Sequence, residues 1–261
     1  LFLGSHGSGG LFLALALAQY IACTNKQLND SCGVCSSCVK HTKFVHPDLH
    51  FVFPVAANQS VKTKPISKNF LTDWRAILTE SPYFSLFDWI KYIGIENKQG
   101  IISVEESAHI VKDLSFKPYE SDTKIMLIWM PEKMNIQAAN KILKIIEEPP
   151  HKTLFLLVAE SEENILATVL SRTQLFKVPR YPDAEVVQYL VGRGLANEKA
   201  QMIATIVEGD INEALKLAEY TQDAAQNSLC FVQWMRLCFN ALQVKDIDKL
   251  VQWSDTMAKS G

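Results

Sequence analysis

The chain has 261 residues, of which 48% are hydrophobic and 21% are charged, and its formal net charge is −2. These values are typical of a globular protein with one large domain or two to three smaller ones, and they give no overall basic signature for nucleic acid. The apolar stretch 11–22 lacks the basic flank of a signal peptide, and no run of about 18 apolar residues occurs without a polar break. We therefore expect a reducing cytoplasmic location and no membrane partner. Because the chain begins inside an apolar run without an initiator methionine, we also expect that it is a fragment.

The first eleven residues have the pattern of a short strand, a glycine-rich turn and the start of an apolar helix. Phosphate-binding loops have the spacing G-x-x-x-x-G-K-[ST], in which the lysine reaches the β- and γ-phosphates and the hydroxyl holds Mg²⁺. Gly4 and Gly9 occupy the two glycine positions, but Gly10 replaces the lysine and Leu11 replaces the hydroxyl residue. The sequence therefore predicts the backbone of a nucleotide site without its chemistry.

Four cysteines follow the first helix with the spacing C-x8-C-x2-C-x2-C. They are Cys23, Cys32, Cys35 and Cys38. Four thiolates at this spacing can form a tetrahedral shell around Zn²⁺, so we predict a structural zinc module over about residues 22–50. Two disulfides fit less well in a chain of this size, and an iron–sulfur cluster would need a cysteine where Thr42 stands. The nearby His41, His46 and His50 are interpreted as bystanders, because four cysteines already complete the shell.

Apolar runs alternate with helical patterns through the next part of the chain. Strands are predicted within 45–54 and at 124–130, 153–159 and 174–178. Helices are predicted within 69–86 and at 104–114, 136–146 and 162–170. Ser103-Val104-Glu105-Glu106 has the pattern of a capping box, and Asn135 is expected to be an N-cap. The alternation predicts an α/β fold with a doubly wound parallel sheet.

The segment 56–99 begins as a polar loop and then becomes rich in aromatic residues. These are Trp74, Tyr83, Phe84, Phe87, Trp89 and Tyr92. We interpret them as core residues rather than as a contact surface.

After residue 182 only helical patterns remain. Short helices are predicted at 184–192, 198–207 and 212–220, followed by two longer amphipathic helices at 226–242 and 246–258. The change of pattern predicts an α/β domain over 1–180, a small helical domain over 181–222 and the start of a further helical domain over 223–261.

Several segments resemble the AAA+ ATPases of the bacterial clamp-loader family. The cysteine cluster after the first helix, followed by His46-Pro47-Asp48, is similar to the zinc module of these subunits. Residues 138–150 resemble the family's A-x-N-x-L-L-K-x-L-E-E-P-P helix, and Ser171-Arg172-Thr173 resembles its S-R-C motif. The resemblance covers nearly the whole chain. It implies an AAA+ P-loop-type domain over 1–180, a helical lid over 181–222 and a helical collar domain that begins at 223 and stops early.

Departures from the family pattern indicate the clamp-loader member that does not hydrolyse ATP. The ATPase subunits end one strand with an acidic pair that holds Mg²⁺, whereas Trp129 and Met130 stand at those positions here. Their lid offers an arginine to the phosphates, and Asn212 stands in that place. Since the lysine and the hydroxyl of the loop are also missing, the resemblance implies no productive ATP binding in this chain.

Arg172 corresponds to the arginine finger of the family, with Ser171 beside it, and the resemblance implies that it acts in trans on ATP held by a neighbouring subunit. A planar guanidinium can contact a γ-phosphate through two hydrogen bonds and stabilise the charge that develops during phosphoryl transfer. Thr173 replaces the usual cysteine of this motif.

The resemblance implies a non-catalytic subunit of the clamp loader in the DNA polymerase III holoenzyme. Its partners would be an ATPase subunit across Arg172 and the clamp-opening subunit, and, through the assembly, the sliding clamp and primed DNA. One alternative is a divergent active P-loop hydrolase, although the nearest downstream lysine is Lys26. The other is a zinc-dependent nucleic-acid-binding module, although only Lys26, Lys40 and Lys43 are basic near the cysteines.

Overall fold

The computed structural model describes residues 1–220 apart from 82, 96 and 97, and beyond them residues 231, 234, 235, 237, 238, 251, 253 and 254. The helices predicted at 226–242 and 246–258 therefore lie mostly outside the described residues. None of the described helices is long and apolar enough to cross a membrane.

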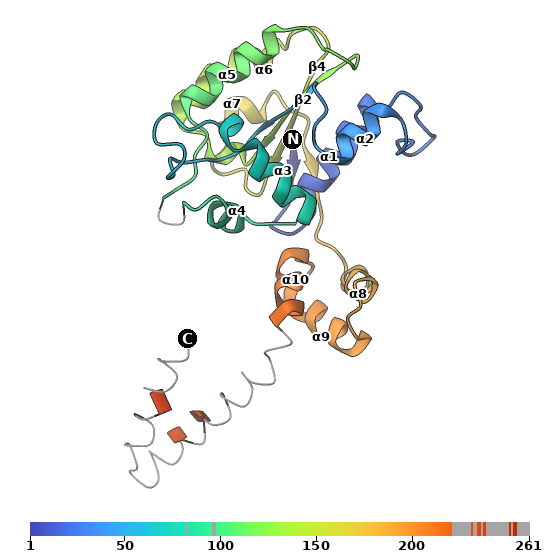
Figure 1. The fold of residues 1–261 in the computed structure, drawn as a ribbon, viewed down its shortest axis with the longest axis vertical. Helices are drawn as coiled ribbons and strands as arrows, with labels where there is room; N and C mark the ends of the chain where they lie inside the picture. Colours follow the sequence, from blue (N-terminus) through green and yellow to red (C-terminus); the bar gives the residue numbers. More distant parts are fainter. Residues whose placement is uncertain are drawn as a thin grey trace.

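The first part of the chain is built around one sheet of five parallel strands in the order β2-β3-β4-β1-β5 (Figure 1). The strands are β1 (Phe2–Leu3), β2 (Leu49–Val52), β3 (Lys124–Trp129), β4 (Thr153–Ala159) and β5 (Phe176–Lys177). The predicted parallel sheet is confirmed, although β5 is shorter than the predicted strand. Because the strands are parallel, the residues that follow β1, β3 and β4 meet at one edge, where Gly4 N–H donates to Ala159 O at 3.2 Å and Met130 N–H donates to Val158 O at 2.8 Å.

Helices cover both faces of the sheet (Figure 1). One face carries α1 (Gly10–Ala22), α3 (Leu71–Glu80) and α4 (Leu86–Tyr92), with α2 (Ser36–Thr42) packed beside α1. The other face carries α5 (Val104–Ser115), α6 (Ile136–Glu147) and α7 (Ala167–Leu170). Every residue of β3 is therefore buried, as expected for a central parallel strand. This includes Lys124, whose amine donates to the carbonyl oxygens of Asp113 and Phe116 at 2.7 and 2.6 Å.

The aromatic residues of segment 56–99 contribute to the main core on the α1 face. Trp74 and Trp89 are fully buried. Trp74 stacks on Phe53 with 4.1 Å between ring centroids and meets Trp89 edge-on at 5.1 Å. The core interpretation is confirmed for these side chains, whereas Phe87 and Tyr92 stay 65% and 43% exposed.

Two predicted helices differ in extent from the observed ones. Within 69–86, where one helix was predicted, the structure has the end of a short 3₁₀ turn followed by α3, which ends at Glu80. A separate helix, α4, then begins after Ser85, whose hydroxyl caps it by accepting from the N–H of Asp88 at 3.0 Å. The helix predicted at 162–170 is confined to α7, because the residues before it form turns.

The capping box predicted at the start of α5 is only half formed. Ser103 accepts from the N–H of Glu106 at 3.5 Å, but the Glu106 carboxylate accepts from the N–H and hydroxyl of Ser67, at 2.6 and 3.0 Å. Burial raises the pKa of Glu106 to about 7, although the bonds from Ser67 act in the opposite direction. A contact from a distant segment has replaced the local one.

Three short helices follow the sheet and form a unit of their own, the three-helix unit. They are α8 (Asp183–Gly192), α9 (Asn197–Val207) and α10 (Ile211–Tyr220). Their facing sides form a small apolar core that includes Val186, Leu190 and Ile203. In Figure 1 this unit lies below the sheet, with α10 on the side of α1 and α4.

Candidate functional site

The glycine-rich loop has the expected backbone but encloses very little space. Gly9 precedes α1 with a φ of 82°, and Gly7 has a φ of 71°, a left-handed conformation that glycine adopts without strain. The cavity above the loop has a volume of about 40 Å³ and is closed by Tyr83, Phe84 and Trp129. Ligand pockets usually measure roughly 300–1,000 Å³, and one water occupies about 30 Å³ in the liquid. The cavity above the loop is therefore closer in size to a water molecule than to a ligand pocket.

Aromatic packing occupies the place where an acidic pair was expected in an ATPase. Trp129 is 3% exposed and packs against Trp74 and Phe84, with 5.2 Å between ring centroids in each case. Met130 is 2% exposed and ends the strand in a left-handed conformation, with a φ of 56°. Neither side chain can hold a metal-bound phosphate.

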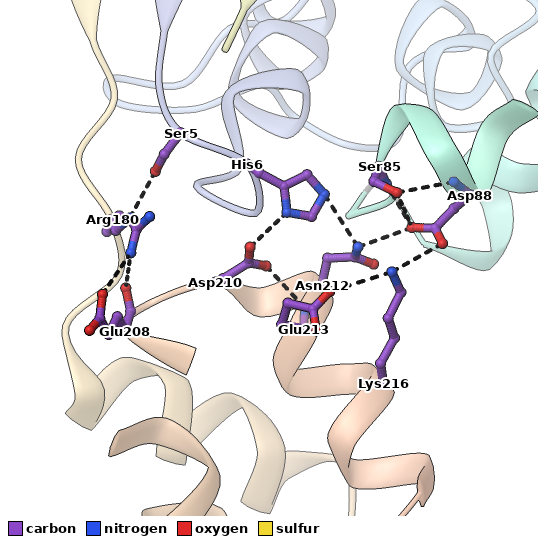
Figure 2. A network of polar contacts seen from close by, with 10 residues as sticks. All are labelled: Ser5, His6, Ser85, Asp88, Arg180, Glu208, Asp210, Asn212, Glu213 and Lys216. Carbon is purple, nitrogen blue, oxygen red and sulfur yellow. Dashed lines mark hydrogen bonds and ion pairs between the residues drawn. The ribbon is translucent and has the colours of Figure 1, made fainter. Parts of the chain in front are cut away.

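The other charged groups beside the loop are one guanidinium and two carboxyls: Arg180 Nε donates to Ser5 Oγ at 3.0 Å (Figure 2). Glu132 accepts from the N–H of Glu160 at 2.9 Å, and burial raises the pKa of both side chains. Where a nucleotide site presents a lysine to the phosphates, Gly10 stands in this chain, and the Arg180 guanidinium beside the loop is paired with Glu208 at 3.3 Å.

A polar network joins the loop to the three-helix unit (Figure 2). The ring of His6, within the loop, lies between Asp210 and Asn212, with Nδ1 2.6 Å from Asp210 Oδ2 and Nε2 3.3 Å from Asn212 Nδ2. Asn212 also donates to Asp88 Oδ2 at 3.0 Å, and Lys216 Nζ lies 3.1 Å from Asp88 Oδ1. The chain's own side chains thus connect the loop, α4 and α10.

Asn212 is at the centre of this network rather than at a phosphate. It is 5% exposed, and a neutral amide there joins the loop to α4. Burial opposes ionisation of Asp88, but hydrogen bonds from Ser85, Lys216 and Asn212 lower the pKa of Asp88 to about 2. No sequence pattern predicts these contacts, because His6 and Asp210 are 204 positions apart.

The His6–Asp210 pair makes the free energy of unfolding depend on pH. The hydrogen bond that His6 donates to Asp210 raises the pKa of His6 above its usual 6.5. Burial and Lys216 act against this, and Glu160 adds to it. The pKa of His6 is higher in the folded state than in the unfolded state. The pair therefore contributes fully to the free energy of unfolding below about pH 6.5, and this contribution is lost as the pH rises through the folded-state pKa. On the acid side it is lost as the pH falls through the pKa of Asp210, which His6 and backbone N–H groups lower despite burial.

Asp210→Asn is therefore expected to cost more free energy of unfolding at about pH 6 than at about pH 8.5. The difference should be at most about 1 kcal/mol, since both side chains are partly exposed to solvent. Asparagine preserves the cap that Asp210 places on the N–H of Glu213. Denaturant titration at the two pH values measures the cost, with Glu213→Gln as the control whose cost should not change. Equal costs of Asp210→Asn at both pH values would contradict the prediction.

The four cysteines come together at the ends of α1 and α2. Their sulfurs all lie within 4.8 Å of one another, and they are the single group of this kind among the described residues. The Sγ atoms of Cys23 and Cys32 are 3.6 Å apart and those of Cys32 and Cys38 are 3.9 Å apart, too far for disulfides. A tetrahedral Zn²⁺ with Zn–S bonds of about 2.3 Å requires roughly 3.8 Å between sulfurs. The cluster therefore fits such an ion.

The electrostatics of the cysteine cluster favour a bound cation. Hydrogen bonds from Thr24 and from the backbone of Cys38 lower the pKa of Cys35 to about 5, whereas burial raises the pKa of Cys38 to about 12. Without a cation, the buried Cys38 thiolate would be unfavourable beside a second thiolate. Backbone N–H groups point at three of the sulfurs, at 3.3–3.4 Å.

The nearby histidines are not part of the cluster among the described residues. His41 and His46 are buried with their rings 4.5 Å apart, and burial lowers the pKa of His41 to about 4. The Asp48 carboxylate accepts from the N–H groups of Tyr119, Glu120 and Ser121, at 2.5, 2.8 and 2.8 Å. His46-Pro47-Asp48 thus fixes the cysteine module to the segment before β3.

The cysteine module does not present a basic surface. Lys40 pairs with Glu120 at 2.5 Å, and Lys26 lies over the ring of Tyr20 at 5.8 Å. With two of its three lysines engaged in this way, the module lacks the charge that nucleic-acid binding would require.

Arg172 follows α7 at the surface and contacts the end of α6. Its Nε lies 2.5 Å from Glu147 Oε1, and its Nη1 donates to Thr168 O at 2.8 Å and to Ser171 Oγ at 3.1 Å. The side chain is 36% exposed. Within the part of the chain that the structure describes, it makes no hydrogen bond or ion pair to the glycine-rich loop.

The parallel sheet, the glycine-rich loop after β1 and the three-helix unit define a P-loop-type α/β protein, in which aromatic side chains line the small cavity above the loop. The family model described as "DNA polymerase III, delta subunit" matches residues 1–182, and the chain belongs to this family. This confirms the resemblance to clamp-loader subunits.

Several known relatives are named as DNA polymerase III subunit delta', and others as subunit gamma or tau. The chain is 24% identical over 218 residues to DNA polymerase III subunit delta' of Bacillus subtilis, which covers 84% of this chain and 53% of the relative. It is 23% identical over 225 residues to the Escherichia coli subunit of that name, which covers 86% of this chain and 55% of the relative. The chain thus spans about half the length of these relatives. The chain is also similar to the solved structure of a DNA polymerase III gamma subunit-related protein of Thermotoga maritima. The match covers 93% of this chain and 61% of the solved chain, with 15% sequence identity and a TM-score of 0.47.

Proposed function

We propose that the chain acts as a non-catalytic AAA+ subunit of the replicative clamp loader. In this role it supports ATP-dependent loading of the sliding clamp onto primed DNA and supplies Arg172, with Ser171 beside it, as an arginine finger in trans. One contrast carries the proposal: the loop that would bind ATP is filled by aromatic and carboxyl side chains, while a guanidinium remains at the surface. A chain built in this way can act on a neighbour's nucleotide and not on its own.

The proposed assembly assigns a role to each part of the chain. Residues 1–180 form the AAA+ domain, 181–222 the lid and 223–261 the start of the collar. An ATPase subunit faces Arg172, the clamp-opening subunit is a further neighbour, and the whole assembly works in the cytoplasm. The network from His6 through Asn212 to Asp88 holds the lid against the loop without a ligand.

We also propose that Cys23, Cys32, Cys35 and Cys38 hold a structural Zn²⁺. Such an ion supplies the positive charge that stabilises four thiolates and closes the loop between α1 and α2. It takes no part in phosphoryl transfer.

Restoring the lost loop residues is expected not to restore ATP binding. Gly10→Lys with Leu11→Thr returns the lysine and the hydroxyl, but the 40 Å³ cavity and the carboxyls remain. Titration calorimetry with Mg-ATP should therefore show no binding tighter than millimolar for the wild type or for the double variant, and neither should hydrolyse ATP alone. Circular dichroism would check that the variant is folded. Micromolar binding by either protein would overturn the non-catalytic half of the proposal.

A further inference from the structure

The end of α6 carries a carboxylate where helix electrostatics do not favour one. Asn135 caps the start of this helix by accepting from Ala138 N–H at 2.7 Å, and its last residue is Glu147. The C-terminus of a helix bears partial negative charge, so an acidic side chain there is unfavourable. Buried Ile142 and Ile146 anchor this end of α6 in the core of the sheet's second face. Glu147 is thus held at a fixed place, and its charge faces Arg172.

Three contacts fix the plane of the Arg172 guanidinium. Glu147 Oε1 forms an ion pair with Nε at 2.5 Å, and Nη1 donates to the carbonyl of Thr168 at 2.8 Å and to the hydroxyl of Ser171 at 3.1 Å. A guanidinium has five N–H groups, so the two on Nη2 remain. No hydrogen bond among the described residues uses Nη2. Its two N–H groups can therefore donate to an acceptor outside the chain.

We propose that Glu147 is the positioning residue for Arg172: it orients the guanidinium so that Nη2 points toward a phosphate on the neighbouring subunit. This inference rests on the proposed function of Arg172. In the isolated chain the side chains of the pair are 36% and 39% exposed, so the pair contributes little to stability. Once a neighbouring subunit excludes water, the orientation of the guanidinium decides whether its positive charge lies beside the negative charge that develops during phosphoryl transfer.

The adjacent Glu148 provides a matched control on the same helix end. It is exposed, and its carboxylate makes no hydrogen bond or ion pair with the described residues. The variants are Glu147→Ala, Glu147→Gln and Glu148→Ala, each in the full chain. In ¹⁵N spectra of the chain, the Arg172 Nε–H signal should be protected from exchange in the wild type and in Glu148→Ala. It should lose this protection in Glu147→Ala.

The same variants are then compared in the reconstituted clamp loader with clamp and primed DNA. Glu147→Ala should lower kcat between about tenfold and a hundredfold with KM for ATP unchanged, and Glu147→Gln, which keeps an acceptor oxygen, should lower it less. Glu148→Ala should have no effect. In an Arg172→Ala background, Glu147→Ala should add nothing.

Each outcome decides one proposal. If Arg172→Ala lowers turnover but Glu147→Ala leaves it unchanged or raises it, the positioning role fails and the finger stands. Equal losses in Glu147→Ala and Glu148→Ala, or a further loss in the Arg172→Ala background, would also overturn it. If Arg172→Ala changes nothing, the finger in trans fails and the positioning role fails with it, whereas the Nε–H protection still reports whether the pair exists.

Discussion

Arg172→Ala is expected to lower ATP turnover at the neighbouring site of a reconstituted clamp loader by roughly 10³-fold, the lower end of the range for arginine fingers. The physical reason is that a guanidinium at the γ-phosphate stabilises charge that develops only in the transition state, so its loss lowers kcat rather than substrate affinity. Folding of the chain should be unaffected, because Arg172 is partly exposed and its ion pair lies at the surface.

Steady-state turnover with clamp and primed DNA measures this effect. Arg172→Lys should recover only part of the loss, since a lysine keeps the charge but cannot form two parallel hydrogen bonds. Arg193→Ala is a suitable control, because Arg193 is an exposed arginine just after α8, with its guanidinium 5.1 Å from the ring of Tyr189. A fully assembled clamp loader with unchanged turnover in Arg172→Ala would refute the role in trans.

Loss of the metal is the second change with a large expected effect. Cys38 is buried at the start of α2, and Cys38→Ser should reduce the zinc content from about one ion per chain to none. Structural zinc sites in small peptides contribute about 10–16 kcal/mol of apparent binding free energy at neutral pH, so the loop between α1 and α2 should lose its fixed conformation. The sheet should stay folded, because its two apolar cores do not include the four cysteines.

Elemental analysis and limited proteolysis test this prediction together. Cleavage within residues 24–34 should accelerate in Cys38→Ser and in chelator-treated wild type. Cys238→Ser changes a cysteine outside the cluster and should preserve both metal content and protection. The outcome that would contradict the prediction is a wild-type protein, purified under reducing conditions, that contains no zinc and whose loop still resists proteolysis. It would show that the cluster folds without metal.

Sequence alone determined the features that depend on neighbouring residues. The buried run of β3, the Asn135 cap of α6 and the glycine loop after β1 were predictable because hydrophobic period, caps and turns are set within a few positions. The four cysteines were recognisable because metal-ligand spacing is local. Missing groups were equally visible, since Gly10 and Leu11 cannot supply a lysine and a hydroxyl whatever surrounds them.

Only the tertiary structure decided what fills the empty nucleotide position and what holds Arg172. Trp129 packs on aromatic rings from segment 56–99, His6 reaches Asp210 across 204 positions, and Glu147 meets Arg172 from another helix. No local period encodes such pairs, because they form only where parallel strands bring their carboxyl ends to one edge and helices fold back across the sheet. The same reason explains why Glu106 does not complete its own capping box. Its carboxylate accepts hydrogen bonds from Ser67, a distant residue that the fold brings close, instead of from the N–H of Ser103.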